Sequence, residues 1–209
     1  KGIRIIARLS ALGYALRMRD IFNHPVVKDL AALLVRQESL ADNGEVRGEA
    51  ALSPIQRWFF SQGLDNEEHY NQSFLLRAAG RIDSPILARA LDEIVRHHDV
   101  LRASFRRENG LVKQFIEPFR EGRFWGLAEA GEGSDPGVLL DQAEKSMKLE
   151  GAKLQAVILR GRGREADRLF LAIHHLVIDT VSWRILLEDL SRLYAGMLEG
   201  KTLSLPDKT

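Results

Sequence analysis

The sequence of 209 residues contains no cysteine. Without thiols the chain can form no disulfide bond, offers no cysteine ligand for zinc and has no thiol nucleophile. The absence of cysteine fits a cytoplasmic protein, which is the location we expect. The sequence also lacks an apolar run that approaches the roughly 20 residues needed to span a bilayer. Its first residues do not form the pattern of a secretory signal peptide.

A strong charge of one sign is missing as well, because 30 Lys and Arg residues face 29 Asp and Glu residues and leave a net charge of +1. Such a balance gives no electrostatic reason to expect nucleic acid or a membrane surface as a partner. The hydrophobic content of 45% and the charged content of 28% are typical of globular proteins. The length allows one large domain, or a small and a medium one.

One stretch, residues 169–190, dominates what is present. An apolar run that is typical of a buried strand leads into an amphipathic helix, predicted over residues 181–198, with Asp179 or Thr180 as its N-cap. Polar groups at such a junction lie at the edge of a sheet, where sites are commonly built. The junction has the spacing H-H-x-x-x-D-x-x-S-W, formed by His174, His175, Asp179, Ser182 and Trp183.

The two histidines of this junction are neighbours on the predicted strand. Successive strand residues point to opposite faces, so His174 and His175 cannot both serve one point in space. This geometry disfavours a metal site and favours a single working imidazole. The alternative is a pair of ordinary histidines at the end of a strand.

Three parts follow from the pattern along the chain. Residues 1–37 predict a small helical unit, and the polar, aperiodic residues 38–50 predict a linker. Residues 51–209 alternate helical and strand patterns, which indicates an α/β domain with one mixed sheet and helices on a face. Within it, residues 120–135 are rich in glycine and charge and predict an irregular crossing.

Two local signals in the α/β part are strong. Ser53, Pro54 and Gln56 form the pattern of a capping box with proline at the first helical position, so a helix should begin there. Asn109-Gly110, between two strand-like runs, is typical of a tight hairpin.

The junction motif resembles the H-H-x-x-x-D-G-x-S signature of the condensation superfamily of nonribosomal peptide synthetases. Residues 96–105, R-H-H-D-V-L-R-A-S-F, resemble the superfamily motif R-H-E-x-L-R-x-x-F. The tryptophan after the serine, and the segments 52–60 and 69–73, are similar to the epimerization branch. The resemblance implies a chloramphenicol-acetyltransferase-like mixed sheet with helices, namely the N-terminal subdomain of an epimerization domain over residues 51–209.

Residues 1–37 resemble the C-terminal part of a peptidyl carrier domain, from just after its G-G-D-S loop. This resemblance implies the cofactor 4′-phosphopantetheine, with its attachment serine before Lys1. The partners implied are a carrier-tethered aminoacyl or peptidyl thioester and the other synthetase domains.

The activity implied by the resemblance is Cα epimerization, from L to D, of the carrier-bound thioester, with His175 as the acid or base. His174 is expected to support the backbone turn, and Asp179 to pair with Arg102. The residues with supporting roles are therefore His174, Asp179, Arg102, Ser182 and Trp183, the last two by packing or by lining a tunnel. No metal is expected.

Two positions depart from the family pattern, because Thr180 replaces a glycine and His98 replaces a glutamate. The second proton carrier of the family is a glutamate in a second half, which we expect after Thr209, so these residues alone should not epimerize. The alternatives are a condensation domain that forms peptide bonds, a non-catalytic docking relative and a free acyltransferase, against which the carrier-like segment argues.

Overall fold

A computed structural model describes residues 2–36, 44–131, 133–201, 203–206 and 208. By its internal contacts the chain divides into two compact units, residues 1–44 with 206–209, and residues 45–205. The assignment of residues 1–37 to a carrier domain, 38–50 to a linker and 51–209 to an epimerization subdomain stays a prediction. Residues 38–43 of the predicted linker lie outside the described residues.

The first unit consists of three short helices and a two-stranded ribbon. Its elements are α1 (Gly2–Ala11), β1 (Tyr14–Ala15), α2 (Met18–Asn23), α3 (Val27–Ala32) and β2 (Val35–Arg36), with β1 antiparallel to β2. Leu16 is buried, whereas Phe22 and Val27 are largely exposed. Among its side chains that the structure describes, the unit therefore buries few apolar ones, as expected for so short a segment.

The second unit is built on two sheets rather than the single sheet that the sequence predicts. The larger has the order β4-β9-β8-β7, formed by Asn71–Arg77, Arg168–His174, Leu154–Leu159 and Trp125–Ala130. β7 and β8 run parallel and the other neighbours are antiparallel, so this sheet is mixed as predicted. The smaller has the order β3-β6-β5, formed by Gly48–Ala50, Leu111–Ile116 and Ala103–Glu108, all antiparallel.

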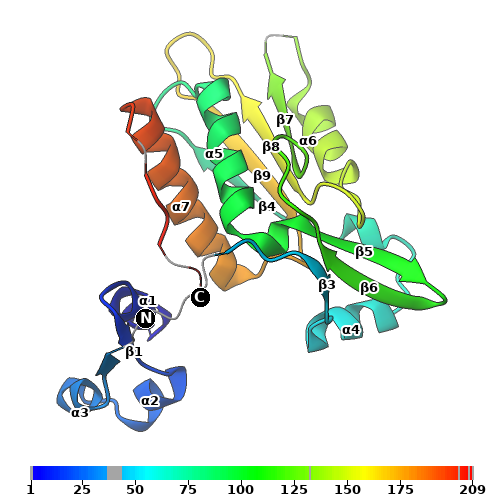
Figure 1. Cartoon of the computed structure of the whole chain (residues 1–209). Coiled ribbons are helices and arrows are strands. Elements are labelled where there is room, and N and C mark those ends of the chain that lie inside the picture. The colour runs from blue at the N-terminus through cyan, green and yellow to red at the C-terminus, as the bar shows by residue number, and fades with distance from the viewer. Residues whose placement is uncertain (1, 37–43, 132, 202, 207, 209) are drawn as a thin grey trace. The chain divides into compact units, whose positions relative to one another are not determined.

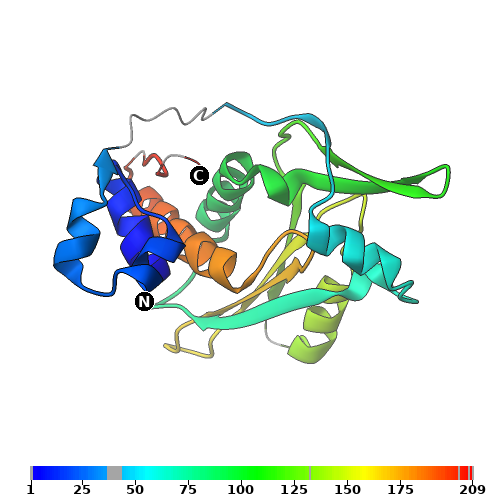
Figure 2. The same ribbon diagram turned by 90° about the horizontal axis from the view of Figure 1, so that it is seen from below.

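Helices cover both faces of the four-stranded sheet (Figures 1 and 2). α5 (Ser84–His97) and α7 (Thr180–Leu198) lie on one face, and α6 (Pro136–Lys145) lies on the other. Side chains of β9 alternate accordingly. Leu171 and Ile173 belong to the core shared with α5 and α7, whereas Phe170 and Ala172 pack in the cluster that contains Met147.

The remaining helical elements connect strands and helices of the second unit. α4 (Pro54–Ser61) precedes the 3₁₀ turn η1 (Glu67–His69) and strand β4, and the 3₁₀ turn η2 (Asp99–Arg102) joins α5 to β5. Among the described residues, none forms a helix long and apolar enough to cross a membrane.

In two places the structure is more regular than the sequence predicts. The end of the predicted linker forms β3, which pairs with β6, and the predicted crossing contains β7, which pairs with β8. Both strands gain their partners from distant segments, which a local pattern does not reveal. A Cβ on Gly126 of β7 would lie 2.0 Å from Oε1 of Gln155 on β8, so a larger residue there would require the Gln155 side chain to move.

The local signals are confirmed. The Ser53 side chain accepts from the Gln56 backbone N–H, and the Gln56 side chain accepts from the Ser53 N–H, which completes the capping box of α4. Asn109 and Gly110 adopt φ values of 52° and 79° between β5 and β6, in the left-handed region that a tight hairpin needs. Asp179 is the N-cap of α7.

Candidate active site

The junction motif lies where β9 ends and α7 begins. His174 is the last residue of β9 and pairs in register with Asn71 of β4. At the other end, Oδ1 of Asp179 accepts the backbone N–H of Ser182 at 2.7 Å and caps α7. The five residues between His174 and Thr180 are thus fixed at both ends by regular structure.

His174 is fully buried, and both of its ring nitrogens bond to backbone. Nε2 donates to the Glu67 carbonyl at 2.8 Å, and Nδ1 accepts the Leu176 N–H at 3.2 Å. Because a carbonyl only accepts and an N–H only donates, these partners fix the Nε2–H tautomer. Burial lowers the pKa of His174 to about 4, so the ring is neutral near pH 7. It ties the turn to η1.

His175 points elsewhere and remains half-buried. Its Nδ1 donates to the Ile178 carbonyl at 2.8 Å, and its backbone N–H donates to the Tyr70 carbonyl at 2.8 Å. The ring stacks on Tyr70 with centroids 5.4 Å apart and planes inclined by 12°. With the Nδ1 proton engaged, a neutral His175 carries its lone pair on Nε2.

That Nε2 atom has a side-chain neighbour on β4. The amide nitrogen of Gln72 lies 3.1 Å from Nε2 of His175, and Oε1 of Gln72 accepts from the Trp183 indole N–H at 2.9 Å. Trp183 is only 2% exposed and lies edge-on to Phe74, with ring centroids 4.9 Å apart. The contacts join β4, the turn and α7 in one chain of hydrogen bonds.

The predicted pair between Asp179 and Arg102 does not form, and this expectation is wrong. Arg102 is fully buried and bonds to Asp99 at 2.6 Å. Its other donors go to the carbonyls of Val95, Arg96, Glu117 and Val46. The free carbonyls at the end of α5 take up the guanidinium, while the free N–H groups at the start of α7 take up the Asp179 carboxylate. Hydrogen bonding by Ser182 N–H lowers the pKa of Asp179.

The structure shows the surroundings of the two residues that depart from the family pattern, Thr180 and His98. Thr180 is the exposed first residue of α7. His98, in place of a glutamate, brings Nε2 within 3.0 Å of Oδ2 of Asp189 on α7. A glutamate at position 98 would face that carboxylate with a like charge, so the histidine suits its neighbour.

Sequence reasoning missed the three side chains that hold the turn from outside. Gln72 and Tyr70 contact the His175 ring, and Gln56 donates from Nε2 to the Leu176 carbonyl at 3.0 Å. All three lie in segments 52–60 and 69–73, which carry the family resemblance. The resemblance of these segments to the family indicated that they matter, but it did not indicate which group each side chain contacts.

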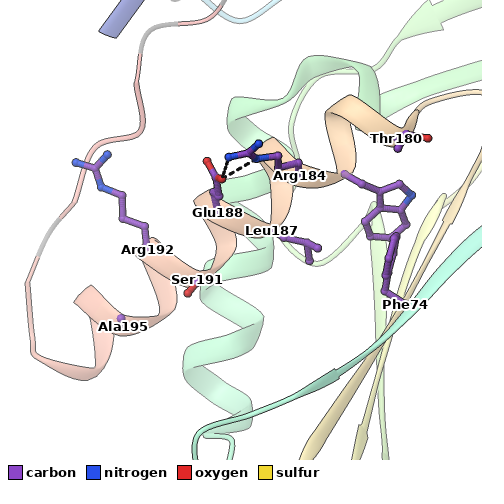
Figure 3. Close-up of a pocket in the computed structure, with 9 residues that line it drawn as sticks. Phe74, Thr180, Arg184, Leu187, Glu188, Ser191, Arg192 and Ala195 are labelled. Carbon is purple, nitrogen blue, oxygen red and sulfur yellow. Dashed lines mark hydrogen bonds and ion pairs between the residues drawn. The ribbon is translucent and has the colours of Figure 1, made fainter. Parts of the chain in front are cut away.

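A groove of about 710 Å³ runs along α7 beside this network (Figure 3). Phe74, Trp183 and Leu187 supply its apolar wall, and Arg184 and Arg192 lie along the same helix. Arg184 bonds to Glu188 one turn later, at 2.9 Å. His175 does not line this groove. Within the part of the chain that the structure describes, no three His, Asp or Glu side chains gather as metal ligands.

Comparison with known families identifies this architecture. Residues 46–209 match the family described as the condensation domain. The chain belongs to the condensation domain family of nonribosomal peptide synthetases. The superfamily that the sequence motifs predict is thereby confirmed.

Similar condensation-family chains occur within much larger synthetases. The chain is 39% identical over 220 residues to surfactin synthase subunit 2 of Bacillus subtilis (strain 168), covering 100% of this chain and 6% of that protein. It is 35% identical over 215 residues to gramicidin S synthase 1 of Brevibacillus brevis, covering 100% of this chain and 19% of that protein. The chain thus spans less than a fifth of the length of either relative.

Solved structures confirm the mixed α/β condensation-domain fold. The epimerization domain from the third module of tyrocidine synthetase B matches with a TM-score of 0.73 and 34% identity, over 80% of this chain and 39% of that one. The starter condensation domain of rhizomide synthetase matches with a TM-score of 0.61 and 19% identity, over 75% of this chain and 40% of that one. The second match shows a shared fold alone.

Proposed function

We propose that this condensation-family unit takes part in Cα epimerization of a carrier-bound aminoacyl or peptidyl thioester. The observation that carries the proposal is the state of His175: its Nδ1 proton is held by the Ile178 carbonyl, so Nε2 of the half-buried ring carries the lone pair, and a side-chain amide, that of Gln72, faces it. The 34% identity to an epimerization domain supports this reaction over others of the family.

The reaction begins with removal of the Cα proton by Nε2 of His175. The electron pair of the C–H bond moves into the thioester carbonyl and forms an enolate, and a second group returns a proton to the opposite face of Cα. An imidazole can take up and return a proton near neutral pH. His174 is unsuited to this step, because it is buried and both of its nitrogens are engaged with backbone.

The substrate would arrive on a 4′-phosphopantetheine arm carried by a peptidyl carrier domain, whose C-terminal part we assign to residues 1–37. The three short helices of the first unit support this assignment. The G-G-D-S loop that bears the arm is not found in the sequence, so no residue of this chain is assigned to attach it. Other synthetase domains are the further partners.

The test follows hydrogen at Cα. A carrier-loaded aminoacyl thioester is incubated in D₂O with the synthetase polypeptide that contains this chain, and deuterium at Cα and the chirality of the released amino acid are measured. His175→Ala should lower the exchange by about 10²–10⁴-fold. His24→Ala, at an exposed position of the first unit, is the control and should leave the exchange unchanged. Full exchange in His175→Ala would refute the assignment.

A condensation reaction is the second candidate, because the matching family is described as the condensation domain and the fold is shared with a starter condensation domain. The same imidazole would then act on an attacking amine. Supplying a second loaded carrier in the same assay separates the two: a peptide product without inversion at Cα supports condensation. Carrier binding with neither product would indicate a docking relative without chemistry.

A further inference from the structure

The orientation of the Gln72 amide is fixed by its partners. The Trp183 indole nitrogen can only donate, so the Gln72 atom 2.9 Å away must be the carbonyl oxygen. The amide NH₂ group then faces Nε2 of His175 at 3.1 Å. The other end of the imidazole is fixed as well, because Nδ1 donates to the Ile178 carbonyl. The donors and acceptors therefore run in one direction from Trp183 to Ile178.

This direction suits a neutral ring and conflicts with a protonated one. A proton on Nε2 of His175 would point at the NH₂ group of Gln72, so two donors would face each other across 3.1 Å. Rotating the amide to present its oxygen would break the hydrogen bond from Trp183 and leave that buried indole N–H unpaired. Phe74 packs edge-on against Trp183 and helps to hold the indole in place.

We propose that Gln72 and Trp183 are positioning residues for His175, which hold Nε2 as a hydrogen-bond acceptor and oppose a lasting proton on it. The inference rests on the proposed function, because it concerns the group that takes the Cα proton. A ring held in this way keeps the Nε2 lone pair that proton removal needs, and a proton that it has taken up faces the NH₂ group of Gln72. That is the behaviour an epimerase needs in a group that must be ready for the next turnover.

The other groups around the ring have different effects. The Asp179 carboxylate interacts with His175 through its charge and would favour the protonated ring. His174 is neutral near pH 7, since burial lowers its pKa to about 4. The Tyr70 ring stacks on the imidazole. The Gln72 amide and the Asp179 carboxylate therefore act on the ring in opposite senses.

The variants separate positioning from simple packing. Trp183→Phe keeps an aromatic ring but removes the indole N–H, so Gln72 can turn its oxygen toward a protonated His175. Gln72→Glu offers a carboxylate that accepts from both neighbours. The matched controls are Trp58→Phe and Gln62→Glu on and after α4, where both side chains are exposed.

The experiment records long-range ¹H–¹⁵N spectra of the imidazole nitrogens of the full chain across pH, without substrate. The native ring should show the Nδ1–H tautomer. In Trp183→Phe and Gln72→Glu the ring should lose its Nε2 proton about one pH unit higher than in the native chain. This shift corresponds to a tenfold lower proton concentration. Both controls should follow the native chain.

Native-like titration of the ring in Trp183→Phe and Gln72→Glu, each with folded spectra, would overturn the proposal. Should Trp183→Phe fail to fold, native-like titration in Gln72→Glu, which changes a half-buried strand residue, still overturns the proposal. The measurement needs no turnover, so its failure is distinct from failure of the epimerase assignment. Altered titration together with peptide product and no Cα exchange would keep the positioning role and remove the epimerase.

Discussion

Two adjacent histidines differ because their rings meet different surroundings. His174 is enclosed, with one nitrogen donating to Glu67 and the other accepting from Leu176. His175 keeps a half-buried ring with Nε2 turned to a polar side chain. Alternation along a strand is sufficient to separate them, and the residue types alone would not distinguish their roles.

His174 makes the stability of the chain sensitive to acid. Its pKa falls from an ordinary 6.5 to about 4 on folding, so between these pH values the unfolded state binds more protons. The free energy of unfolding should therefore decrease as pH falls from 6.5 to 4, by up to about 3 kcal/mol from this group. Urea denaturation at several pH values measures the effect.

Carboxylates titrate in the same window, so the comparison is between variants. His174→Gln can keep a donor and an acceptor but cannot titrate, and its pH dependence should be flatter than that of the native chain. His24→Gln, at an exposed position, should keep the native slope. Equal slopes in all three chains would mean that His174 is not held neutral.

Lys153 is a second buried base whose pKa is lowered by burial, and its effect occurs at higher pH. Its side chain is fully buried, donates from Nζ to the Gly151 carbonyl at 2.9 Å and lies 5.6 Å from the centre of the Phe105 ring. Burial lowers the pKa of Lys153 from 10.5 to about 7. Between these values the unfolded state binds more protons, so this group makes stability rise with pH from 7 to 10.5.

Lys153→Met should therefore be more stable than the native chain at pH 7 and below, and this advantage should shrink as pH approaches 10.5. Denaturation midpoints at pH 6, 8 and 10 measure it. The control is Lys145→Met, since Lys145 is exposed and pairs with Asp141 one turn earlier on α6. A constant difference between Lys153→Met and the native chain at all three pH values would contradict the reasoning.

At the scale of elements, the start of β9 depends on one carboxylate. Asp167 is fully buried and accepts from Arg81 and Arg160, each at 2.7 Å, and from the backbone N–H groups of Ile82 and Gly161. Burial alone would raise the pKa of Asp167, but these hydrogen bonds hold it below its usual range. The carboxylate thus joins β9, the turn before it and the entry to α5.

Asp167→Asn should destabilise the chain by about 3 kcal/mol, because the amide NH₂ group would face N–H donors that now donate to the buried carboxylate. Asp141→Asn removes a carboxylate of the same type from an exposed pair and should change stability by no more than about 0.5 kcal/mol. Guanidinium denaturation of both variants gives the comparison. Similar small losses would show that the hydrogen bonds of Asp167 survive as an amide.

The hairpin between β5 and β6 is a local element of a different kind. Gly110 adopts a φ of 79°, and a Cβ there would meet no other atom within 4 Å. Gly110→Ala should therefore destabilise by about 1 kcal/mol through backbone conformation alone. Gly80→Ala, at a glycine with no positive φ and equal free space, is the control. Equal losses in the two variants would contradict this explanation.

At the scale of the whole second unit, Arg102 connects segments that are distant in sequence. It bonds to carbonyls at the end of α5, before β3 and after β6, and to the Asp99 carboxylate. It thereby joins the helix of one sheet to the strands of the other. Asp179 lies outside this set and stabilises the start of α7.

A double-mutant cycle tests this separation. Arg102→Lys and Asp179→Ala should each destabilise, the latter by about 1 kcal/mol as the loss of an N-cap. Because the two side chains share no bond, the double variant should equal the sum of the single effects within about 0.5 kcal/mol. A coupling energy of several kcal/mol would show that Arg102 and Asp179 interact, as the family motif led us to expect.

Much of the second unit could be predicted because its signals are local. The capping box of Ser53 and Gln56, the Asn109-Gly110 hairpin and the cap of α7 each depend on residues within a few positions of one another. The motif that marks the condensation domain family is equally local. The amino-acid sequence by itself thus determined these elements, the family and the candidate imidazole.

Tertiary structure alone decided which distant groups meet. β3 and β7 exist through pairing with β6 and β8, Arg102 turned to backbone carbonyls instead of Asp179, and Gln72 reached His175 from a strand 103 residues earlier. The physical reason is that hydrogen-bond partners are chosen by burial and by the free groups nearby once the chain has closed. A linear pattern records what each side chain can donate or accept, and the folded chain determines to whom.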